Sequence, residues 1–357
     1  MRGLFSFLFG ASMLLVIERA AASGRSPART HFTRMAWLLV FGLLHFYFVW
    51  FGDILAGYAQ VGMIAYLFHR LSAKALVRWG VGFLVVQIIF VAAGAARIFY
   101  LEANATLPGA DVALVREWAE FQRGFAPLVG QSLADKLGMF RGAYEGIMGY
   151  RLFDHMWDPF LSLLFFGFET LAYFLFGMAL LKTGFFRGDW EPARYRRVAL
   201  IGFGIAIPVY AALAFILYRD GFSVPMVFTC ALAATVPFRP VMVIGIAALI
   251  ILATRNGGAF VERVAAAGRA AFTNYLGTSI LMTTLFYGYG IGLYGSMSRI
   301  ELWLVVIAMW ALMLVWSKPW LEHFRYGPFE WLWRSLSRFE LQPMRRPRSV
   351  AGAVPAE

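Results

Sequence analysis

Cysteine and charged residues are scarce in this sequence of 357 residues. Cys230 is the only cysteine, so the chain can form no internal disulfide and offers no cysteine set for a metal. The five histidines lie in different segments, which argues against a metal centre. Only 15% of the residues are charged and 61% are hydrophobic, and long uncharged stretches recur from end to end, which a soluble core of this length could not bury. The composition therefore indicates a polytopic membrane protein.

Motifs of several large enzyme classes are also absent. The sequence contains no phosphate-binding loop, no His-Glu-x-x-His pair and no nucleophile elbow. A formal net charge of +12 is typical of nucleic-acid-binding proteins, but here the basic residues occupy short segments between apolar runs, where they determine topology. We therefore expect no nucleic acid and no metal, and the lipid bilayer is the expected partner.

Nine apolar runs are candidate membrane spans, at residues 4–17, 35–51, 54–69, 79–100, 159–181, 198–217, 222–254, 272–293 and 299–316. When alternate gaps are assigned to one side, 22 of the 32 Lys and Arg residues fall in segments 18–34, 70–78, 182–197, 255–269 and 317–357. The positive-inside rule makes these gaps cytoplasmic, together with the carboxy terminus. We predict an all-α polytopic transmembrane bundle of about nine spans.

The runs divide the chain into four regions. Residues 1–100 form a four-span region, 101–157 an extracytoplasmic insert, 158–342 a second transmembrane region and 343–357 a basic tail, predicted to be disordered. In the insert, apolar residues recur at helical spacing and predict an amphipathic helix, which serves as a lid, as a packing element or in substrate gating; they are Val112, Val115, Trp118, Phe121 and Phe125.

Two further segments depart from simple spans. Residues 222–254 are too long for one untilted span and contain Pro225, Pro237 and Pro240, which predict a broken or kinked helix. Transporters build binding sites from broken helices, although plain kinks also occur. After the last span, tryptophans alternate with Arg325, Arg334 and other basic residues, which predicts a cytoplasmic interfacial helix.

Few ionisable groups lie inside the apolar runs, where a charge costs about 2.5–3.5 kcal/mol. His45 lies about six residues from the outer end of its run, and Asp53 lies in the tight turn that follows. If the two side chains meet, they form a general base near neutral pH, and we name both as candidate catalytic residues. The alternative is a neutral histidine bonded to a backbone carbonyl, with Asp53 capping the next helix.

Other polar residues in the runs are candidates for substrate binding. Glu169 lies near the middle of its run and is either protonated and hydrogen-bonded or part of a polar pathway. The remaining candidates are Gln60, Asn274, Tyr275 and Ser279, which also serve as ordinary hydrogen-bonding residues between helices.

The first run, Leu4 to Ile17, is uncharged for fourteen residues, short of the roughly 20 that span a bilayer. A signal-peptide interpretation would place Arg25, Arg29 and Arg34 outside, against the positive-inside rule. We expect instead a further helix upstream, with a cytoplasmic start.

Three stretches resemble the YeiB-like bacterial membrane proteins, whose carboxy-terminal half is known as domain of unknown function 418. They are "RGLFSFLFGASMLLVIERA", "RMAWLLVFGLLHFYFVWFGDILAGYAQVGMIAYLF" and the pair "GRAAFTNYLGTSILMTTLFYGYGIGLYG" and "WLEHFRYGPFEWLWRSL". Members of this family usually begin with one more helix, containing a Leu-Arg-Gly-type motif, before the part that corresponds to Arg2. Thr278 is a second departure, because a glutamine is expected after the "NYL" motif. The resemblance implies a bacterial cytoplasmic membrane protein.

The family is distantly similar to transmembrane acyltransferases such as heparan-alpha-glucosaminide acetyltransferase, and residues 55–66, with Gln60, share part of that similarity. The likeness implies acyl transfer from cytoplasmic acyl-CoA to a hydroxyl or amine on the far side. In those enzymes the key histidine and asparagine come from the upstream region, so His45 is a candidate from the residues alone.

Two functions remain open. As an acyltransferase, the chain would bind the phosphates of acyl-CoA with basic residues of its cytoplasmic face. Glu330 lies in the same stretch of sequence as Arg325 and Arg334. The candidate donor-binding residues are Arg34, Arg70, Arg325, Glu330 and Arg334. As a transporter, it would line a pathway with His45, Glu169 and Asn274. A non-catalytic scaffold and an oligomer are also compatible with the sequence. An arginine-lined pocket that reaches His45 would favour transfer, and a polar cavity through Glu169 would favour transport.

Overall fold

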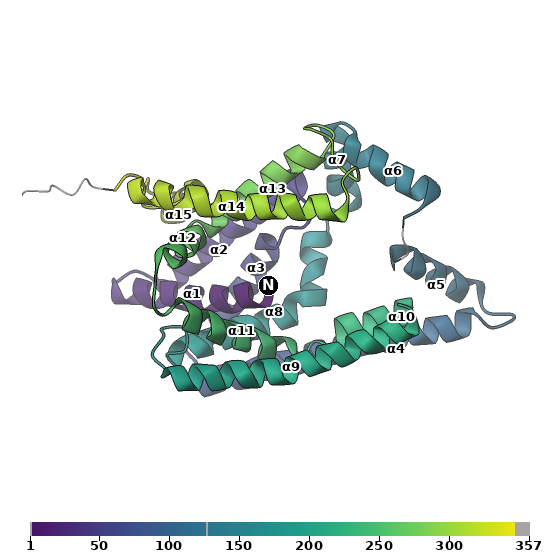
Figure 1. Ribbon diagram of the computed structural model, residues 1–357, viewed down its shortest axis with the longest axis horizontal. Coiled ribbons are helices and arrows are strands. Elements are labelled where there is room, and N and C mark those ends of the chain that lie inside the picture. The colour runs from purple at the N-terminus through teal and green to yellow at the C-terminus, as the bar shows by residue number, and fades with distance from the viewer. Residues whose placement is uncertain (1, 126–127, 347–357) are drawn as a thin grey trace, which may run out of the picture. The chain divides into compact units, whose positions relative to one another are not determined.

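The computed structural model describes residues 2–125 and 128–346, and over these ranges the chain is built from helices (Figure 1). Fifteen of the described helices are α-helices, joined by short π- and 3-10-helical segments, and the only extended pairing there is an isolated bridge between Phe324 and Arg345. The predicted all-α, polytopic helical fold is confirmed. It follows from long apolar runs in which each helix bonds its own backbone, as a bilayer requires.

Six described helices are long and apolar enough to cross a membrane, namely α1 (Arg2–Ala22), α2 (Pro27–Leu44) continued by η1 (His45–Val49), α4 (Ala73–Ala105), α8 (Asp158–Lys182), α9 (Pro192–Asp220) and α14 (Arg299–His323). Only 6% of the apolar window of α14 is buried, so its large side chains face outward, as they do in lipid. Shorter apolar helices cover Leu55–Phe68, Val224–Ala233 and Arg239–Thr254. The chain is thus a membrane protein, and the count of nine spans stays a prediction.

The helix ends follow sequence signals. Ser72 accepts a hydrogen bond from the backbone nitrogen of Ala75 at the start of α4, and Ser298 forms a capping box with Glu301 at the start of α14. Gly221 adopts a left-handed conformation, with φ 74°, directly after α9. These local choices agree with the helix bounds that the structure shows.

The chain divides into two compact units, each made of several segments. The first unit comprises Met1–His31, Gly57–Ala134 and Trp157–Arg255, and the second comprises Phe32–Ala56, Asp135–Met156 and Asn256–Glu357. Three helices pass from one unit into the other along the chain: α2, α3 (Leu55–Ala65) and α6 (Gly130–Arg141).

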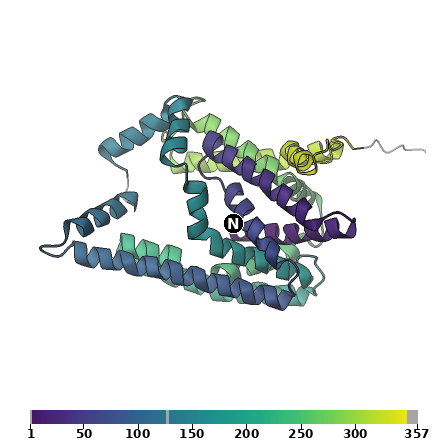
Figure 2. The same ribbon diagram turned by 180° about the vertical axis from the view of Figure 1, so that it is seen from behind.

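In the first unit, α8 packs against α1 and α4, and α9 packs against α11 (Arg239–Thr254), as Figure 1 shows for α9 and α11. Figure 2 shows α4 from behind as one continuous long helix. The backbones of α1 and α8 touch, because a Cβ atom at Gly10 would overlap Phe174 and one at Gly177 would overlap Phe7. Small residues at a crossing allow such close packing between membrane helices. Phe7, Tyr173 and Phe176 form the aromatic part of the adjoining core.

The proline-rich stretch of the first unit is a broken helix, as the sequence predicted. It consists of α10 (Val224–Val227), η4 (Phe228–Ala233), an interruption at residues 234–238 and then α11. Pro237 lies in the interruption and Pro240 near the start of α11, where the missing backbone donor has no consequence.

In the second unit, α12 (Ala259–Arg269) packs on α14, and α13 (Ala271–Phe286) packs on α15 (Pro328–Arg338). The segment η1 packs against α13 and against η3 (Tyr150–Asp154), which follows α7 (Tyr144–Gly149). These contacts bring together three parts of the sequence that are about a hundred or more residues apart, and they build the candidate site.

The structure describes most of the predicted insert and the first residues of the predicted tail. The insert at 101–157 contains α5 (Val112–Phe125), which matches the predicted amphipathic helix, and it also contains α6, α7 and η3. The segment predicted to be an interfacial helix forms α15, and its place at a membrane surface stays a prediction. At the start of the predicted disordered tail, the carbonyl of Met344 accepts a hydrogen bond from the backbone nitrogen of Arg325, and residues 347–357 lie outside the described ranges.

Candidate functional site

The corner between α2 and α3 places the two candidate catalytic residues side by side. At the end of α2 the helix widens into the π-helical turn η1, in which the carbonyl of His45 accepts a hydrogen bond from the nitrogen of Trp50 at 2.8 Å. A Cβ atom at Gly42 would overlap the backbone nitrogen of Ala56, so glycine here lets α2 approach the start of α3 closely. The close approach holds His45 against the turn that contains Asp53.

His45 and Asp53 form a buried pair. Nδ1 of His45 lies 2.8 Å from Oδ1 of Asp53, and each side chain is only 1% exposed. The second carboxylate oxygen of Asp53 accepts a hydrogen bond from the nitrogen of Ala56 at 2.8 Å. The contact and the cap, which the sequence presented as alternatives, therefore exist together, and the cap fixes the carboxylate that orients the histidine.

Tyr275 of α13 closes this pair from the other side. Its hydroxyl accepts a hydrogen bond from the backbone nitrogen of Ile54 at 3.2 Å and lies 3.5 Å from Oδ1 of Asp53. Its ring centre is 5.1 Å from that of His45. The structure thus joins three of the predicted site residues, His45, Asp53 and Tyr275.

The other ring nitrogen of His45 has no hydrogen-bond partner among the described residues, although it is fully buried. When the proton sits on Nδ1 and is donated to Asp53, Nε2 has a free lone pair. A buried polar atom without a partner is costly and rare, and a catalytic or ligand-binding role is one of its recognised explanations. This lone pair is the atom of the site that can accept a proton.

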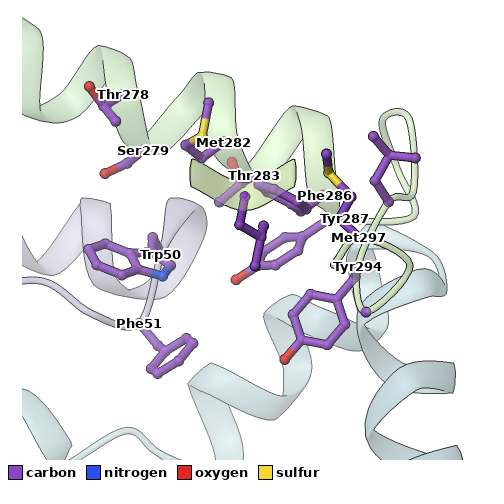
Figure 3. Close-up of a pocket in the computed structure, with 13 residues that line it drawn as sticks. Trp50, Phe51, Thr278, Ser279, Met282, Thr283, Phe286, Tyr287, Tyr294 and Met297 are labelled. Carbon is purple, nitrogen blue, oxygen red and sulfur yellow. The ribbon is translucent and has the colours of Figure 1, made fainter. Parts of the chain in front are cut away.

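A cavity of about 440 Å³ lies near the pair and is lined by the two residues that follow η1, by α13, by the segment after α13 and by Leu302 of α14 (Figure 3). Its lining is mostly apolar and aromatic, with a few hydroxyl groups: Trp50, Phe51, Thr278, Ser279, Met282, Thr283, Phe286, Tyr287, Leu293, Tyr294, Gly295, Met297 and Leu302. Trp50 joins the cavity to the pair, because its ring centre lies 6.2 Å from that of His45. Of the predicted site residues, Ser279 lines this cavity, whereas His45, Glu169 and the predicted arginines are not among its described lining residues.

Glu169 lies in the first unit and is held by a closed set of partners. Its carboxylate, 2% exposed, pairs with Arg2, with Nη1 of Arg239 at 3.1 Å and with the hydroxyl of Tyr173 at 2.8 Å. Its backbone nitrogen donates to Gln87 at 3.2 Å. The protonated form that the sequence left open is not needed, since two cations compensate the carboxylate.

Asn274 and Gln60 join helices. The amide nitrogen of Asn274 donates to the carbonyl of Ala267 at 3.0 Å, and its oxygen accepts from the indole of Trp316 at 2.9 Å. In the first unit, the amide of Gln60 donates to the carbonyl of Pro159 at 3.0 Å. These bonds tie neighbouring helices together.

The predicted donor-binding residues fall into two groups. Arg34 stacks over the ring of Trp333 at 4.2 Å, Arg334 stacks over Tyr326 at 4.4 Å, and the charge of Arg334 acts on Arg34. Arg325 is exposed in the same unit, whereas Arg70 is exposed in the first unit. The basic group of the second unit suits phosphate binding, because aromatic stacking orients the guanidinium planes.

Glu330 has a different role from the one the sequence suggested. Its carboxylate accepts hydrogen bonds from the backbone nitrogens of Phe272 at 2.7 Å and Thr273 at 3.0 Å, and from the hydroxyl of Thr273. These nitrogens are free donors of the first turn of α13, so Glu330 caps that helix from α15. Its carboxylate is thereby occupied, and it also repels a phosphate.

Sequence reasoning missed Arg151 and the tyrosines of the segment after α13. Arg151 is 1% exposed in η3, and Tyr287 and Tyr294 line the cavity. In the sequence Arg151 stands in an insert with five basic and seven acidic residues, where an arginine gives no signal of burial. Within the described residues no three histidine, cysteine or carboxylate side chains gather as a metal site would require.

The chain matches known proteins over most of its length. A family model described as protein of unknown function, DUF418, matches residues 180–340. The protein YxaH of Bacillus subtilis (strain 168) is 31% identical over 359 residues, covering 97% of this chain and 81% of that protein. YeiB of Escherichia coli (strain K12) is 28% identical over 342 residues, covering 94% of this chain and 80% of that protein. No solved structure matches the chain.

Proposed function

The chain belongs to the YeiB-like DUF418 family, and from this premise we propose that it is a transmembrane acyltransferase in which His45 acts as general base. One observation supports this most directly. A buried histidine is oriented by a carboxylate at 2.8 Å through Nδ1 and keeps a lone pair on Nε2, next to an apolar cavity of about 440 Å³. Orientation by a carboxylate is the usual arrangement for a histidine that accepts a proton in acyl transfer.

The proposed reaction transfers an acyl group from acyl-CoA to a hydroxyl or amine. Nε2 of His45 takes the proton of the acceptor as the acceptor oxygen or nitrogen attacks the thioester carbonyl. The bond between carbonyl carbon and sulfur breaks, and the imidazolium of His45 returns the proton to the departing thiolate. Asp53 stabilises the imidazolium that exists between these steps, and Tyr275 helps to hold Asp53 in place.

The cavity and the basic group suggest how the substrates bind. The aliphatic and aromatic lining of the cavity suits an acyl chain, and its hydroxyl groups, such as those of Ser279 and Tyr294, suit a polar acceptor. Arg34, Arg325 and Arg334 would bind the phosphates of acyl-CoA. In this proposal Glu330 does not bind the donor, since its carboxylate caps α13.

The test is thiol release from acetyl-CoA and palmitoyl-CoA by the purified chain in nanodiscs, with a bacterial lipid extract as the source of acceptors. Cys230 is replaced by serine throughout, because a thiol reagent reports the released CoA. We expect His45→Gln to lower the rate about 10²–10⁴-fold, the usual contribution of a general base. His323→Gln is the matched control, since His323 is exposed and bonds a helix carbonyl of its own turn at 3.0 Å. Undiminished turnover by His45→Gln, or no saturable acyl-CoA binding, would reject the proposal.

One observation favours transport as a second candidate. The broken helix of the first unit begins again at Arg239, which pairs with the buried carboxylate of Glu169. Interrupted helices with buried charges are typical of transporter binding sites. The test is the uptake of a small-molecule library into proteoliposomes. Uptake that is abolished by Glu169→Gln and unchanged by His45→Gln would favour this candidate.

We further propose a bacterial cytoplasmic membrane location with a cytoplasmic carboxy terminus, because the basic gaps of the sequence lie on that side under the positive-inside rule. Fusion of green fluorescent protein after residue 357 should give fluorescent cells. Alkaline phosphatase at the same place should be inactive, and the opposite result would reverse the topology.

A further inference from the structure

The second unit contains two π-helical segments that pack against each other, η1 with His45 and η3 with Arg151. π-Helical turns are rare and are often found at functional sites. Four buried side-chain polar atoms of the described residues have no hydrogen-bond partner, and three of them belong to these two segments: Nε2 of His45, and Nε and Nη2 of Arg151. Arg151 has no part in the proposed acyl transfer.

Arg151 is buried and only partly bonded. Its residue is 1% exposed, and its Nη1 donates to the carbonyl of Tyr47, in η1, at a long 3.5 Å. No ion pair joins Arg151 to a carboxylate among the described residues. A buried cation without a counter-charge is strongly unfavourable, and an anionic ligand would supply the missing charge.

The two unpartnered nitrogens define what that ligand is. Nε and Nη2 lie on the same edge of the guanidinium, and their N–H groups point in parallel, as the two oxygens of a carboxylate or phosphate require. The third nitrogen, Nη1, faces away toward Tyr47. The open edge therefore suits one bidentate anion.

Tyr287 connects Arg151 with the cavity. The guanidinium carbon of Arg151 lies 5.6 Å from the ring centre of Tyr287, and the same tyrosine lines the cavity (Figure 3). Tyr287 thus contacts both, and a molecule in the cavity that displaced this ring would come close to the guanidinium.

We propose that Arg151 is a binding residue for an anionic group, a carboxylate or a phosphate, on the molecule that occupies this cavity. The proposal concerns binding alone and does not require acyl transfer. The source of the anion is either a lipid headgroup or a soluble molecule, since both present the same oxygens.

The experiment measures binding of three six-carbon probes to the full chain in phosphatidylcholine nanodiscs by calorimetry: hexyl phosphate, hexanoate and neutral hexanol. We expect saturable binding of at least one of the two anions, at least tenfold tighter than that of hexanol. Equal binding of all three by the wild-type protein would overturn the proposal, whatever the variants do.

Variants then assign the binding to Arg151. Arg151→Met should lower the affinity for the preferred anion at least tenfold and leave hexanol unchanged, and an unchanged anion affinity would overturn the proposal. Arg151→Lys retains the charge without the parallel donors, and we expect intermediate affinity; it replaces the methionine variant if that one does not fold. Arg116→Gln is the control, because Arg116 is exposed and pairs with Glu120 one helical turn away.

Two further measurements separate the alternatives. Phosphatidic acid in the nanodisc competes with the anionic probe if a lipid headgroup fills the site, and does not compete if the ligand is soluble. His45→Gln should retain anion binding while losing acyl transfer, so a failure of the transferase proposal is distinguished from a failure of this one.

Discussion

Two arginines of this protein show opposite arrangements. In the first unit, every side-chain nitrogen of Arg239 donates a hydrogen bond, to Glu169, to Thr235 and to the carbonyls of Ala231 and Leu232. In the second unit, Arg151 is more deeply buried and has two nitrogens without a partner. The same contrast exists between Glu169, whose oxygens are all engaged, and His45, whose Nε2 is not.

The difference teaches where to look for function. A saturated network such as that around Glu169 has a sufficient structural explanation, because every buried charge is compensated. The buried nitrogens of His45 and Arg151 that have no hydrogen-bond partner lower the stability of the fold, and no contact within the described residues compensates for them. Ligand-binding and catalytic side chains are often in this condition.

The largest effect on stability should come from Glu169→Gln. This change leaves Arg2 and Arg239 without their counter-charge, and breaking a buried pair on one side costs about 3–5 kcal/mol. We expect the apparent midpoint of thermal unfolding in detergent, measured by tryptophan fluorescence, to be strongly lowered. Glu117→Gln removes an exposed pair with Arg97 and should change stability by only about 0.2–1 kcal/mol. Equal thermal midpoints for the two variants would show that the buried network of Glu169 contributes no more to stability than an exposed ion pair.

The next effect tests the two arginines directly. Arg239→Met should destabilise the protein by about 1.5–3 kcal/mol, the value of hydrogen bonds to a charged group, because Glu169 keeps its other partners. Arg151→Met should cost nothing or stabilise, since it removes a buried charge that has no counter-ion among the described residues. If the thermal midpoint falls more for Arg151→Met than for Arg239→Met, Arg151 is a structural residue.

A smaller loss is expected from Glu330→Gln. The amide keeps one acceptor oxygen for the nitrogens of Phe272 and Thr273 but loses the negative charge at the start of α13. We expect about 0.5–1 kcal/mol, measured as a shift of the denaturation midpoint. Glu330→Ala removes the cap altogether and should cost more, whereas a donor-binding role would instead change acyl-CoA affinity.

The smallest effect concerns Glu262, whose pKa is lowered below its usual 4.5 by the hydrogen bond and charge of Lys318. A carboxyl with a lowered pKa in the folded state adds stability above its unfolded pKa and loses that contribution as the pH falls through the folded pKa. Glu262→Gln should therefore lower the thermal midpoint slightly at pH 7, and the difference should close as the pH falls through this lowered pKa. Lys318→Met should show the same pH dependence. A difference in thermal midpoint between variant and wild type that persists in acid would contradict this prediction.

The helical content and the broken helix could be predicted from the sequence because they follow from local patterns. Apolar runs, prolines and caps act within a few residues of each other, and the bilayer leaves helices as the main way to bond the backbone. The encounter of His45 with Asp53 was also within reach, since eight residues and a tight turn separate them.

The remainder of the site depends on distant segments, which no local pattern reveals. Arg151 reaches Tyr47 over 104 positions, and Tyr275 reaches Asp53 over 222. Glu330 was assigned to the donor because it stands beside arginines, but its partners, Phe272 and Thr273, come from another helix. The number of membrane spans stays a prediction. A short apolar helix such as α3 has the composition of a membrane span but not its length.

The π-helical turn that begins at His45 makes the length of this segment as important as its composition. Such a turn contains about one residue more than an α-helical turn, and each residue rotates a helix by about 100°. Deleting one residue from 46–49 would restore ordinary helix and turn Trp50 away from the cavity, even though no side chain of the pair had been replaced. Single-residue deletions and insertions at this point should therefore be tolerated much less well than conservative substitutions, and a deletion scan would locate the site independently of any chemistry.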